Sequence, residues 1–341
     1  MTNTHKALIN QEDKSLKVQE VPLPSIISKG EVLVQVEAVA LNPGDWKIRD
    51  WLSKPGDLHG CDFSGTVVEL GEGVTTVQVG DRVASFVLVG SFAEHVKTKA
   101  SLLWEVPDSI DWEQAAALGG AAADTAFQAL SLRHGLPVLG EPVTDKRPFL
   151  VWAASTSVGM YAIQVAKLAG YTVIATASPK NEALVKSFGA DAVYPYADES
   201  TPSKIAEAYP TLSQALDCFA EGTSTLSIAK SFSNKAGKII TLNPVNDETL
   251  ATDFPEVKHE WTTCYTLLGE AVSVGPMEFP LNEEDFKAMA EWKQKVPELV
   301  ASGKLKANPI SHQDGGLESI NDGLDWLKAG KVSAQKLTYR I

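Results

Sequence analysis

The stretch FLVWAASTSVGMYAIQVAKLAGYTVIATAS, from Phe149 to Ser178, decides the fold of this chain. It consists of an apolar strand, a short polar turn, an amphipathic helix and a second apolar strand. This is the layout of a βαβ unit of the kind that binds dinucleotides, with the ligand at the turn after the first strand. The stretch therefore predicts an α/β domain with an open parallel sheet.

The turn of this unit lacks two of the three glycines of the G-x-G-x-x-G pattern. Gly159 can still let the helix pack closely on the strand, whereas Thr156 places a side chain where a pyrophosphate comes nearest. We expect hydroxyl donors and the helix N-terminus to bind a pyrophosphate held slightly further out. The alternative is an ordinary polar loop without a ligand. The residues of the turn are Ala154, Ser155, Thr156, Ser157, Val158 and Gly159.

The end of the second strand indicates which dinucleotide is bound. A site for NAD has an Asp or Glu there, which binds the ribose 2′-hydroxyl and repels a 2′-phosphate. Here the sequence continues Ser178, Pro179, Lys180, without a carboxylate. We therefore predict NADPH as the cofactor, with Ser178 and Lys180 as ligands of the 2′-phosphate. A solvated surface lysine is the alternative for Lys180.

Outside this stretch the sequence pattern changes twice along the chain. The first hundred residues alternate strand-like segments with Gly, Pro and Asp turns, which predicts an all-β, barrel-like module. After Ser178 short strands and helices alternate, as in a doubly wound sheet, and from Pro280 the chain becomes helical and closes with a strand. We expect residues 1–115 and 276–341 to form one domain, and residues 116–275 to form the NADP-binding domain.

Composition excludes several classes of protein. A length of 341 residues suits two domains, and a formal net charge of −13 disfavours nucleic-acid binding. No apolar run approaches the roughly 20 residues that span a membrane, and the first twenty residues lack the features of a targeting signal. The three cysteines are far apart and form no C-x-x-C pair. We expect a cytoplasmic protein that binds no membrane.

Four further segments, taken in order with the βαβ unit, resemble the medium-chain dehydrogenase/reductase superfamily over essentially the whole chain. The resemblance implies a GroES-like β-barrel catalytic domain, made from both ends of the chain, and a Rossmann domain between them. The segments are EVLVQVEAVALNPGDWKIRD (31–50), GCDFSGTVVELGEGVTTVQVGDRV (60–83), DTAFQAL (124–130) and LKAGKVSAQKLTY (327–339).

The positions that bind zinc in the metal-dependent members match Asn42, Cys61 and, approximately, Ala121 in this sequence. One thiol without a histidine cannot make a tetrahedral zinc site, so we expect no metal. The sequence is most similar to the zinc-independent quinone oxidoreductases and their fungal enoyl-reductase-like branch. That resemblance implies an NADPH-dependent reductase of α,β-unsaturated carbonyls or of quinones. An aldehyde or ketone reductase and a non-catalytic NADPH-binding sensor are the alternatives.

The resemblance also implies roles for single residues. Asn42 would orient the substrate, Lys47 would stabilise an oxygen as an ammonium, and Thr125 would touch the nicotinamide. The alternatives are a plain surface lysine for Lys47 and a buried helix cap for Thr125. Tyr196 would lie beside the 2′-phosphate or fill the core, and Gly269 would let the backbone approach the nicotinamide or form a plain turn. Leu242 and Asn243 follow a strand whose carboxyl end belongs at the ligand edge of the sheet.

A small free substrate is the preferred partner, and the relatives occur as monomers or homodimers. A carrier-bound acyl chain would need a basic docking face. Two groups of residues are candidates for that face: Lys47, Arg49 and Lys54, and Lys287, Lys293 and Lys295.

Overall fold

The computed structural model describes residues 3–24 and 28–341. The chain divides into two compact units, each described here by itself. The antiparallel unit comprises Met1–Asp124 and Tyr265–Ile341, and the parallel unit comprises Thr125–Cys264. The domain boundaries after residues 115 and 275 remain predictions from the sequence.

The parallel unit alternates strands and helices, as the sequence predicted. Its elements are η3 (Gln128–Arg133), β8 (Pro148–Trp152), α4 (Ser157–Leu168), β9 (Thr172–Ala177), η4 (Pro179–Asn181), α5 (Glu182–Ser187), β10 (Ala192–Pro195), α6 (Thr201–Ala208), β11 (Gln214–Asp217), α7 (Ser224–Lys230), β12 (Ala236–Thr241), α8 (Glu248–Asp253) and β13 (Glu256–Trp261). Two elements cross the borders of the unit: α3 (Ala121–Phe127) and η5 (Cys264–Leu268).

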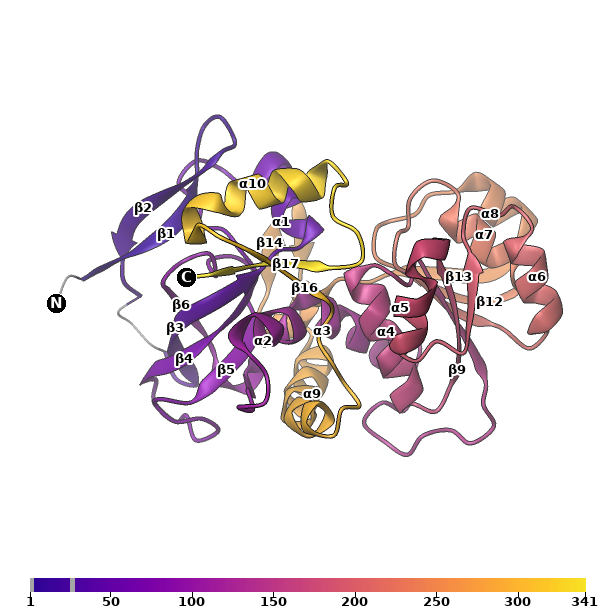
Figure 1. The fold of residues 1–341 in the computed structure, drawn as a ribbon, viewed down its shortest axis with the longest axis horizontal. Helices are drawn as coiled ribbons and strands as arrows, with labels where there is room; N and C mark the ends of the chain where they lie inside the picture. Colours follow the sequence, from indigo (N-terminus) through magenta and orange to yellow (C-terminus); the bar gives the residue numbers. More distant parts are fainter. Residues whose placement is uncertain (1–2, 25–27) are drawn as a thin grey trace. The chain divides into compact units, whose positions relative to one another are not determined.

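The strands of this unit form one sheet in the order β10-β9-β8-β11-β12-β13, and every pairing is parallel. Figure 1 shows the connecting helices α4 to α8 around it. Leu150, Ile174, Ala215 and Ile239, one from each of four adjacent strands, are fully buried in one cluster. Helices on a parallel sheet bury its strands on both sides, which is why each of these four strands has adjacent buried residues that are apolar. The predicted doubly wound sheet is confirmed.

The antiparallel unit contains the two ends of the chain. Its elements are β1 (Thr4–Asn10), β2 (Leu16–Pro22), β3 (Glu31–Ala40), α1 (Pro43–Lys47), η1 (Ile48–Leu52), β4 (Asp62–Leu70), β5 (Arg82–Phe86), β6 (His95–Lys99), η2 (Ala100–Leu102), β7 (Trp104–Glu105), α2 (Trp112–Gly119), β14 (Val272–Val274), β15 (Met277–Phe279), α9 (Glu283–Ala301), β16 (Ile310–Gln313), α10 (Gly316–Lys328) and β17 (Lys336–Arg340).

The main sheet of this unit has the order β16-β17-β3-β4-β5-β7, and β6 also pairs with β3. Strand β17 pairs antiparallel with β3, so the last strand of the chain completes a sheet that begins near its start (Figure 1). Valines of β3 and β4 share one buried cluster there with α10 residues such as Ile320 and Leu324. The expected β-rich module made from both chain ends is therefore present.

No helix among the described residues is long and apolar enough to cross a membrane.

Gly65 in β4 is a position where the sheet tolerates no side chain. A Cβ added there would clash with the backbone oxygen of Gln35 on β3. We expect Gly65→Ala to lower the free energy of unfolding by roughly 1–3 kcal/mol, as overpacking does in other cores. The matched control is Gly44→Ala in α1, where no atom lies within 4 Å of the added Cβ. Thermal unfolding of both variants would check this, and equal melting temperatures would contradict it.

Candidate functional site

The predicted cofactor residues of the parallel unit gather at one edge of its sheet. Strands β8, β9, β10 and β12 end at Trp152, Ala177, Pro195 and Thr241. Because the strands are parallel, all four carboxyl ends lie at the same edge. The strand order changes direction between β8 and β11, which is where open α/β sheets bind ligands. The predicted residues that follow these ends are Ser155, Thr156, Ser157, Val158, Gly159, Ser178, Lys180, Tyr196, Leu242 and Asn243.

The turn after β8 is tight despite its missing glycines. Ala153 has a φ of +58° and is therefore in the left-handed region. In the glycine pattern the first glycine, which makes the tight turn, corresponds to Ala154, one position later. A Cβ at Gly159 would lie 2.7 Å from the Cα of Ala154, which shows how closely α4 packs on the turn. Gly159 therefore has the packing role that the sequence assigned to it.

Thr156 has a structural task in this turn as well. Its Oγ1 accepts a hydrogen bond of 3.1 Å from the backbone N–H of Gly159 and so caps α4. The hydroxyl hydrogen is not used by this bond and can be donated to an anion. The turn therefore combines a capped helix N-terminus, which favours negative charge, with hydroxyl groups on both sides of the cap.

The residues after β9 and β10 lie where solvent and ligands can reach them. Ser178 is half-buried, and Lys180 in η4 is exposed. Tyr196 is 53% exposed, so it does not fill the core, which was the alternative reading of this tyrosine. Among residues 174–181 there is no carboxylate. The acidic residue that typically binds the ribose 2′-hydroxyl in NAD sites is therefore absent from this segment.

Asn243 is fixed in the loop after β12. Its Nδ2 donates to the carbonyl oxygen of Phe219 at 3.2 Å, and its own carbonyl oxygen accepts from Thr241 at 2.9 Å. These bonds tie the loops after β11 and β12 together. Thr125 lies in α3 and is 9% exposed, so its side chain is largely covered.

Asn42 and Lys47 flank the short helix α1 of the antiparallel unit. Asn42 caps the helix, and its backbone N–H donates to Asp45 Oδ2 at 2.6 Å. Lys47 ends the helix, is half-buried, and holds its Nζ 5.8 Å from the centre of the Trp46 ring. One turn of helix therefore carries an amide, a buried acid and an ammonium group.

Behind Asn42 lies a buried set of charges that the sequence analysis missed. Lys336 Nζ donates to Asn42 Oδ1 and lies 3.0 Å from Asp62 Oδ2, and both charged side chains are at most 2% exposed. The other carboxylate oxygen of Asp62 accepts from the backbone N–H of Ala121 at 2.8 Å. Burial and the nearby Asp62 raise the pKa of Asp45 to about 7. Asp62 in the segment CDFSG could have indicated this set from the sequence, because it is a charged residue within an apolar, strand-like segment.

A zinc ion does not fit this set of residues. Asn42 Oδ1 already accepts from the Lys336 ammonium, and Cys61 Sγ donates to the carbonyl oxygen of Leu88 at 3.2 Å. A dication at Asn42 would lie beside that ammonium, and like charges repel strongly in a buried place. In the described part of the chain, no three His, Cys, Asp or Glu side chains are grouped to hold a metal.

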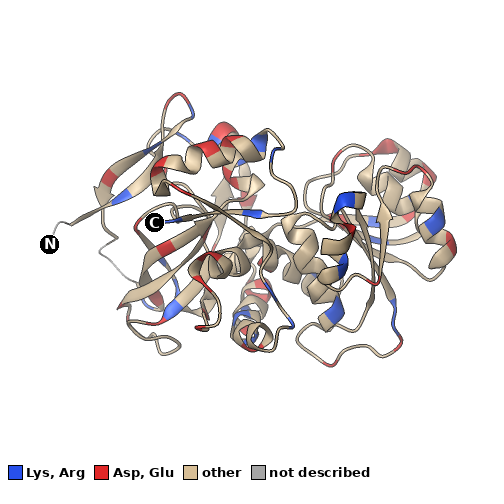
Figure 2. Ribbon diagram, viewed as in Figure 1, with Lys and Arg blue, Asp and Glu red and all other residues tan. Residues whose placement is uncertain are grey.

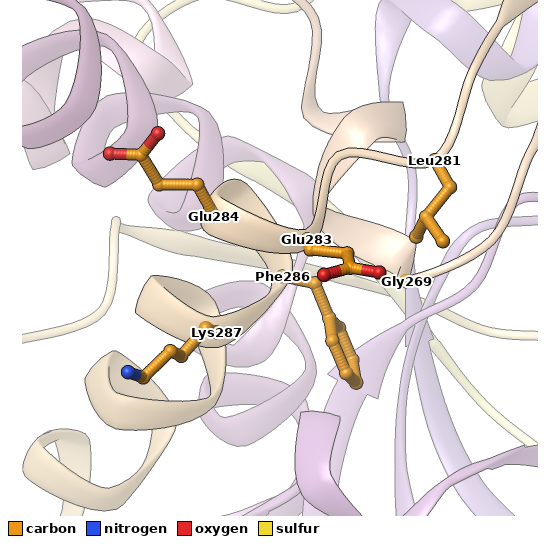
Figure 3. Close-up of a pocket in the computed structure, with 6 residues that line it drawn as sticks. All are labelled: Gly269, Leu281, Glu283, Glu284, Phe286 and Lys287. Carbon is orange, nitrogen blue, oxygen red and sulfur yellow. The ribbon is translucent and has the colours of Figure 1, made fainter.

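Gly269 lies in a different part of the antiparallel unit. It borders a shallow hollow of about 580 Å³ with residues near the start of α9, where Figure 3 shows Glu283 and Phe286 close to it. Its φ is +68°, and a Cβ there would lie 2.5 Å from the Phe286 ring. Both the backbone conformation and the aromatic neighbour therefore require glycine at this position. This requirement is compatible with a plain turn and with a contact to the cofactor.

The two basic groups considered as a docking face are not intact surfaces. Arg49 is buried and bonded to Asp50 and Asp325, each at 2.7 Å. Lys293 is 1% exposed and bonded to Asp124 at 2.6 Å. Figure 2 shows the remaining basic residues interspersed with acidic ones. Arg49 and Lys293 therefore cannot contribute to a basic docking face, because carboxylates already pair with them.

Comparison with known proteins gives the following. Residues 28–108 match the alcohol dehydrogenase GroES-like domain, and residues 157–273 match the domain called zinc-binding dehydrogenase. The chain is 37% identical to the trans-enoyl reductase ACTTS2 of Alternaria alternata over 99% of both chains. It is 38% identical to the trans-enoyl reductase FSL5 of Gibberella zeae, over 100% of this chain and 99% of that one.

Solved structures agree on the fold. The quinone oxidoreductase of Coxiella burnetii superposes with a TM-score of 0.73 at 25% identity, over 99% of both chains. An alcohol dehydrogenase superfamily protein of Novosphingobium aromaticivorans gives a TM-score of 0.81 at 24% identity, again over 99% of both chains. The expected combination of a GroES-like domain with a Rossmann sheet is thereby confirmed.

Asp45 makes stability depend on pH in a defined direction. Its pKa in the folded chain is about 7, against 3.8 for an ordinary aspartate, so between these values only the unfolded chain loses the proton. The contribution of Asp45 to stability is therefore greatest below about pH 4 and falls as the pH rises toward 7. About three pKa units at 1.36 kcal/mol each amount to about 4 kcal/mol. We expect Asp45→Asn to remove that part of the decline, as measured by unfolding from pH 4 to 8.

The control for this measurement is Glu12→Gln, which changes an exposed carboxylate of the same unit. Its stability curve should run parallel to that of the wild type. A parallel curve for Asp45→Asn as well would show that Asp45 is ionised in the folded protein at every pH tested.

Proposed function

The chain belongs to the medium-chain dehydrogenase/reductase family, in the branch of the fungal trans-enoyl reductases, and on that basis we propose an NADPH-dependent, zinc-independent enoyl reductase. Its substrates would be α,β-unsaturated carbonyl compounds or quinones. The observation that carries the proposal is the identity of 37 and 38% with two trans-enoyl reductases over nearly the entire chain. The enzyme class, an oxidoreductase that uses a nicotinamide cofactor, follows from the family itself.

Two features of the parallel unit support NADPH over NADH. Strand β9 is followed by Ser178 and Lys180 without a carboxylate, and the exposed lysine can pair with a 2′-phosphate. Tyr196 is exposed at the same sheet edge, where its ring can lie against the adenosine. The hydroxyls of Ser155, Thr156 and Ser157 and the N-terminus of α4 would hold the pyrophosphate.

When bound, the cofactor would supply a hydride for the β-carbon of the substrate, and a proton from water or from a general acid would complete the reduction at the α-carbon. Before that proton arrives, negative charge develops on the carbonyl oxygen, and the protein must stabilise it. Because Asn42 Oδ1 is occupied by Lys336, the amide can offer only its Nδ2 hydrogens to a substrate oxygen. We propose that Asn42 donates this bond and that the Lys47 ammonium adds positive charge nearby. Thr125 would contact the nicotinamide, and Leu242, Asn243 and Gly269 would shape its surroundings.

The remaining properties are proposals of the same kind. Zinc independence is supported by the ammonium of Lys336 beside Asn42 and by the hydrogen bond that occupies Cys61. A small free substrate is favoured over a carrier-bound chain because Arg49 and Lys293 are buried and the net charge is −13. The cytoplasmic location and the monomeric or dimeric state are predictions that come from the sequence.

The role of Lys180 can be tested through cofactor choice. We expect Lys180→Ala to raise the Kd for NADPH by about 10- to 100-fold, because one charge-assisted bond is worth roughly 1.5–3 kcal/mol. The Kd for NADH should change little, since NADH has no 2′-phosphate. Fluorescence titration measures both constants. Lys186→Ala, which removes an exposed lysine of the neighbouring helix α5, is the control. An equal loss for both cofactors would exclude a 2′-phosphate contact.

The reaction is tested by NADPH oxidation against a 2-enal, an enone, a 1,4-quinone, a saturated aldehyde and an enoyl thioester, with and without a chelator. We expect turnover of the unsaturated compounds that the chelator leaves unchanged. Lys47→Ala should lower kcat by about 10- to 100-fold, because it removes charge that stabilises the transition state. The control is Lys54→Ala, an exposed lysine seven positions along the same segment.

Three outcomes would contradict the proposal in different ways. Turnover of the saturated aldehyde alone would identify a carbonyl reductase. NADPH binding without turnover of any compound would indicate a sensor. Loss of turnover with the chelator would show that a metal takes part.

A further inference from the structure

The ion pair between Lys336 and Asp62 is enclosed in the antiparallel unit. The two side chains are 2% and 0% exposed, and their charged atoms lie 3.0 Å apart. Removing two charges from water is unfavourable, and an apolar pair of similar volume often gives equal or greater stability. Such a pair is therefore weak evidence for a stabilising role. Its other contacts indicate what it positions.

Each member of the pair holds one further group. The Lys336 ammonium donates to Asn42 Oδ1, and Asp62 Oδ1 accepts from the Ala121 backbone N–H at 2.8 Å. Ala121 is the first residue of α3, and only Gly120 separates it from the end of α2. A Cβ at Gly120 would clash with the Asp62 carboxylate, so the chain passes directly over it. The pair therefore fixes both the Asn42 amide and the start of α3.

The contact with Lys336 also determines how the Asn42 amide can act. An ammonium bound to Oδ1 fixes the orientation of the amide and draws electron density toward the oxygen. The Nδ2 hydrogens then become stronger donors, since linked hydrogen bonds polarise one another. Nδ2 is buried and, among the residues the structure describes, has no hydrogen-bond partner. A buried donor without a partner costs about 1–3 kcal/mol, so a partner is expected when the site is filled.

We propose that Lys336, held by Asp62, is a positioning residue that orients and polarises the Asn42 amide toward the substrate oxygen. This inference rests on the proposed enoyl reductase function and assigns to the buried pair a role in it. Lys336 does not touch the substrate in this scheme. Its effect on the reaction passes entirely through Asn42.

A double-mutant cycle tests that dependence. We expect Lys336→Met to lower kcat for an enone by about 10- to 100-fold and Asn42→Ala by about 100-fold, in the range for loss of an oxyanion donor. Because both act through one amide, the double variant should be no slower than Asn42→Ala alone. NADPH affinity should stay within about twofold of the wild type in each variant. Losses that multiply in the double variant would overturn the proposal, as would full kcat in folded Lys336→Met.

Two further variants separate positioning from folding. Lys97→Met removes an exposed ion pair with Glu31 in the same unit and should leave kcat unchanged. If Lys336→Met does not fold, Asp62→Asn combined with Lys336→Met leaves no unpaired charge buried. This neutral pair should fold and should still show the loss of kcat. Full kcat in the neutral pair would overturn the proposal.

A spectroscopic measurement tests the effect of Lys336 on Asn42 even if the protein has no enoyl reductase activity. The side-chain amide signal of Asn42 in ¹⁵N-asparagine-labelled protein is assigned by its disappearance in Asn42→Ala. It should shift in Lys336→Met and not in Lys97→Met. A wild type that binds NADPH but turns over no substrate would refute the function. An unmoved signal would refute the polarisation of Asn42 by Lys336.

Discussion

The antiparallel pairing of β17 with β3 is the constraint on which the antiparallel unit depends. Through it the last strand of the chain lies beside a strand from the first forty residues. The Lys336–Asp62 ion pair depends on this pairing, since the two residues begin β17 and β4, which both pair with β3. Asn42, which directly follows β3 and Leu41, then lies within reach of the same ammonium. One sheet thus assembles three distant segments of sequence.

The parallel unit is organised by a different constraint. Parallel strands joined by crossover helices must all end at one edge, so each loop that leaves that edge can contribute to one ligand site. Hydrogen bonds of Asn243 and Thr156 hold two of these loops in place. The backbone of Ala153 in the left-handed region gives the tight turn that a glycine usually provides, at a strain of roughly 1–3 kcal/mol. The unit therefore keeps the shape of the dinucleotide turn while its sequence departs from the pattern.

Local patterns predicted most of the fold, since strand and helix periodicities depend on neighbours in sequence. They placed the βαβ unit, the sheet edge that carries Ser178 and Lys180, and the packing role of Gly159. They could not place Lys336, whose partners lie more than 270 residues away. Lysine and arginine are taken as solvated unless a partner is known, because burial of an unpaired charge is very unfavourable. The same assumption made Arg49 and Lys293 look like surface residues.

A buried ammonium differs from a metal ion in how it can assist a reaction. A metal with an open coordination position can bind the substrate oxygen directly. The Lys336 ammonium is enclosed. It already donates a hydrogen bond to Asn42 and forms an ion pair with Asp62. It can therefore act on a substrate only through one of them, and Asp62, as an anion, would repel developing negative charge. Asn42 is the neutral partner with donors on its far side, so the electrostatic influence of Lys336 must pass through that amide.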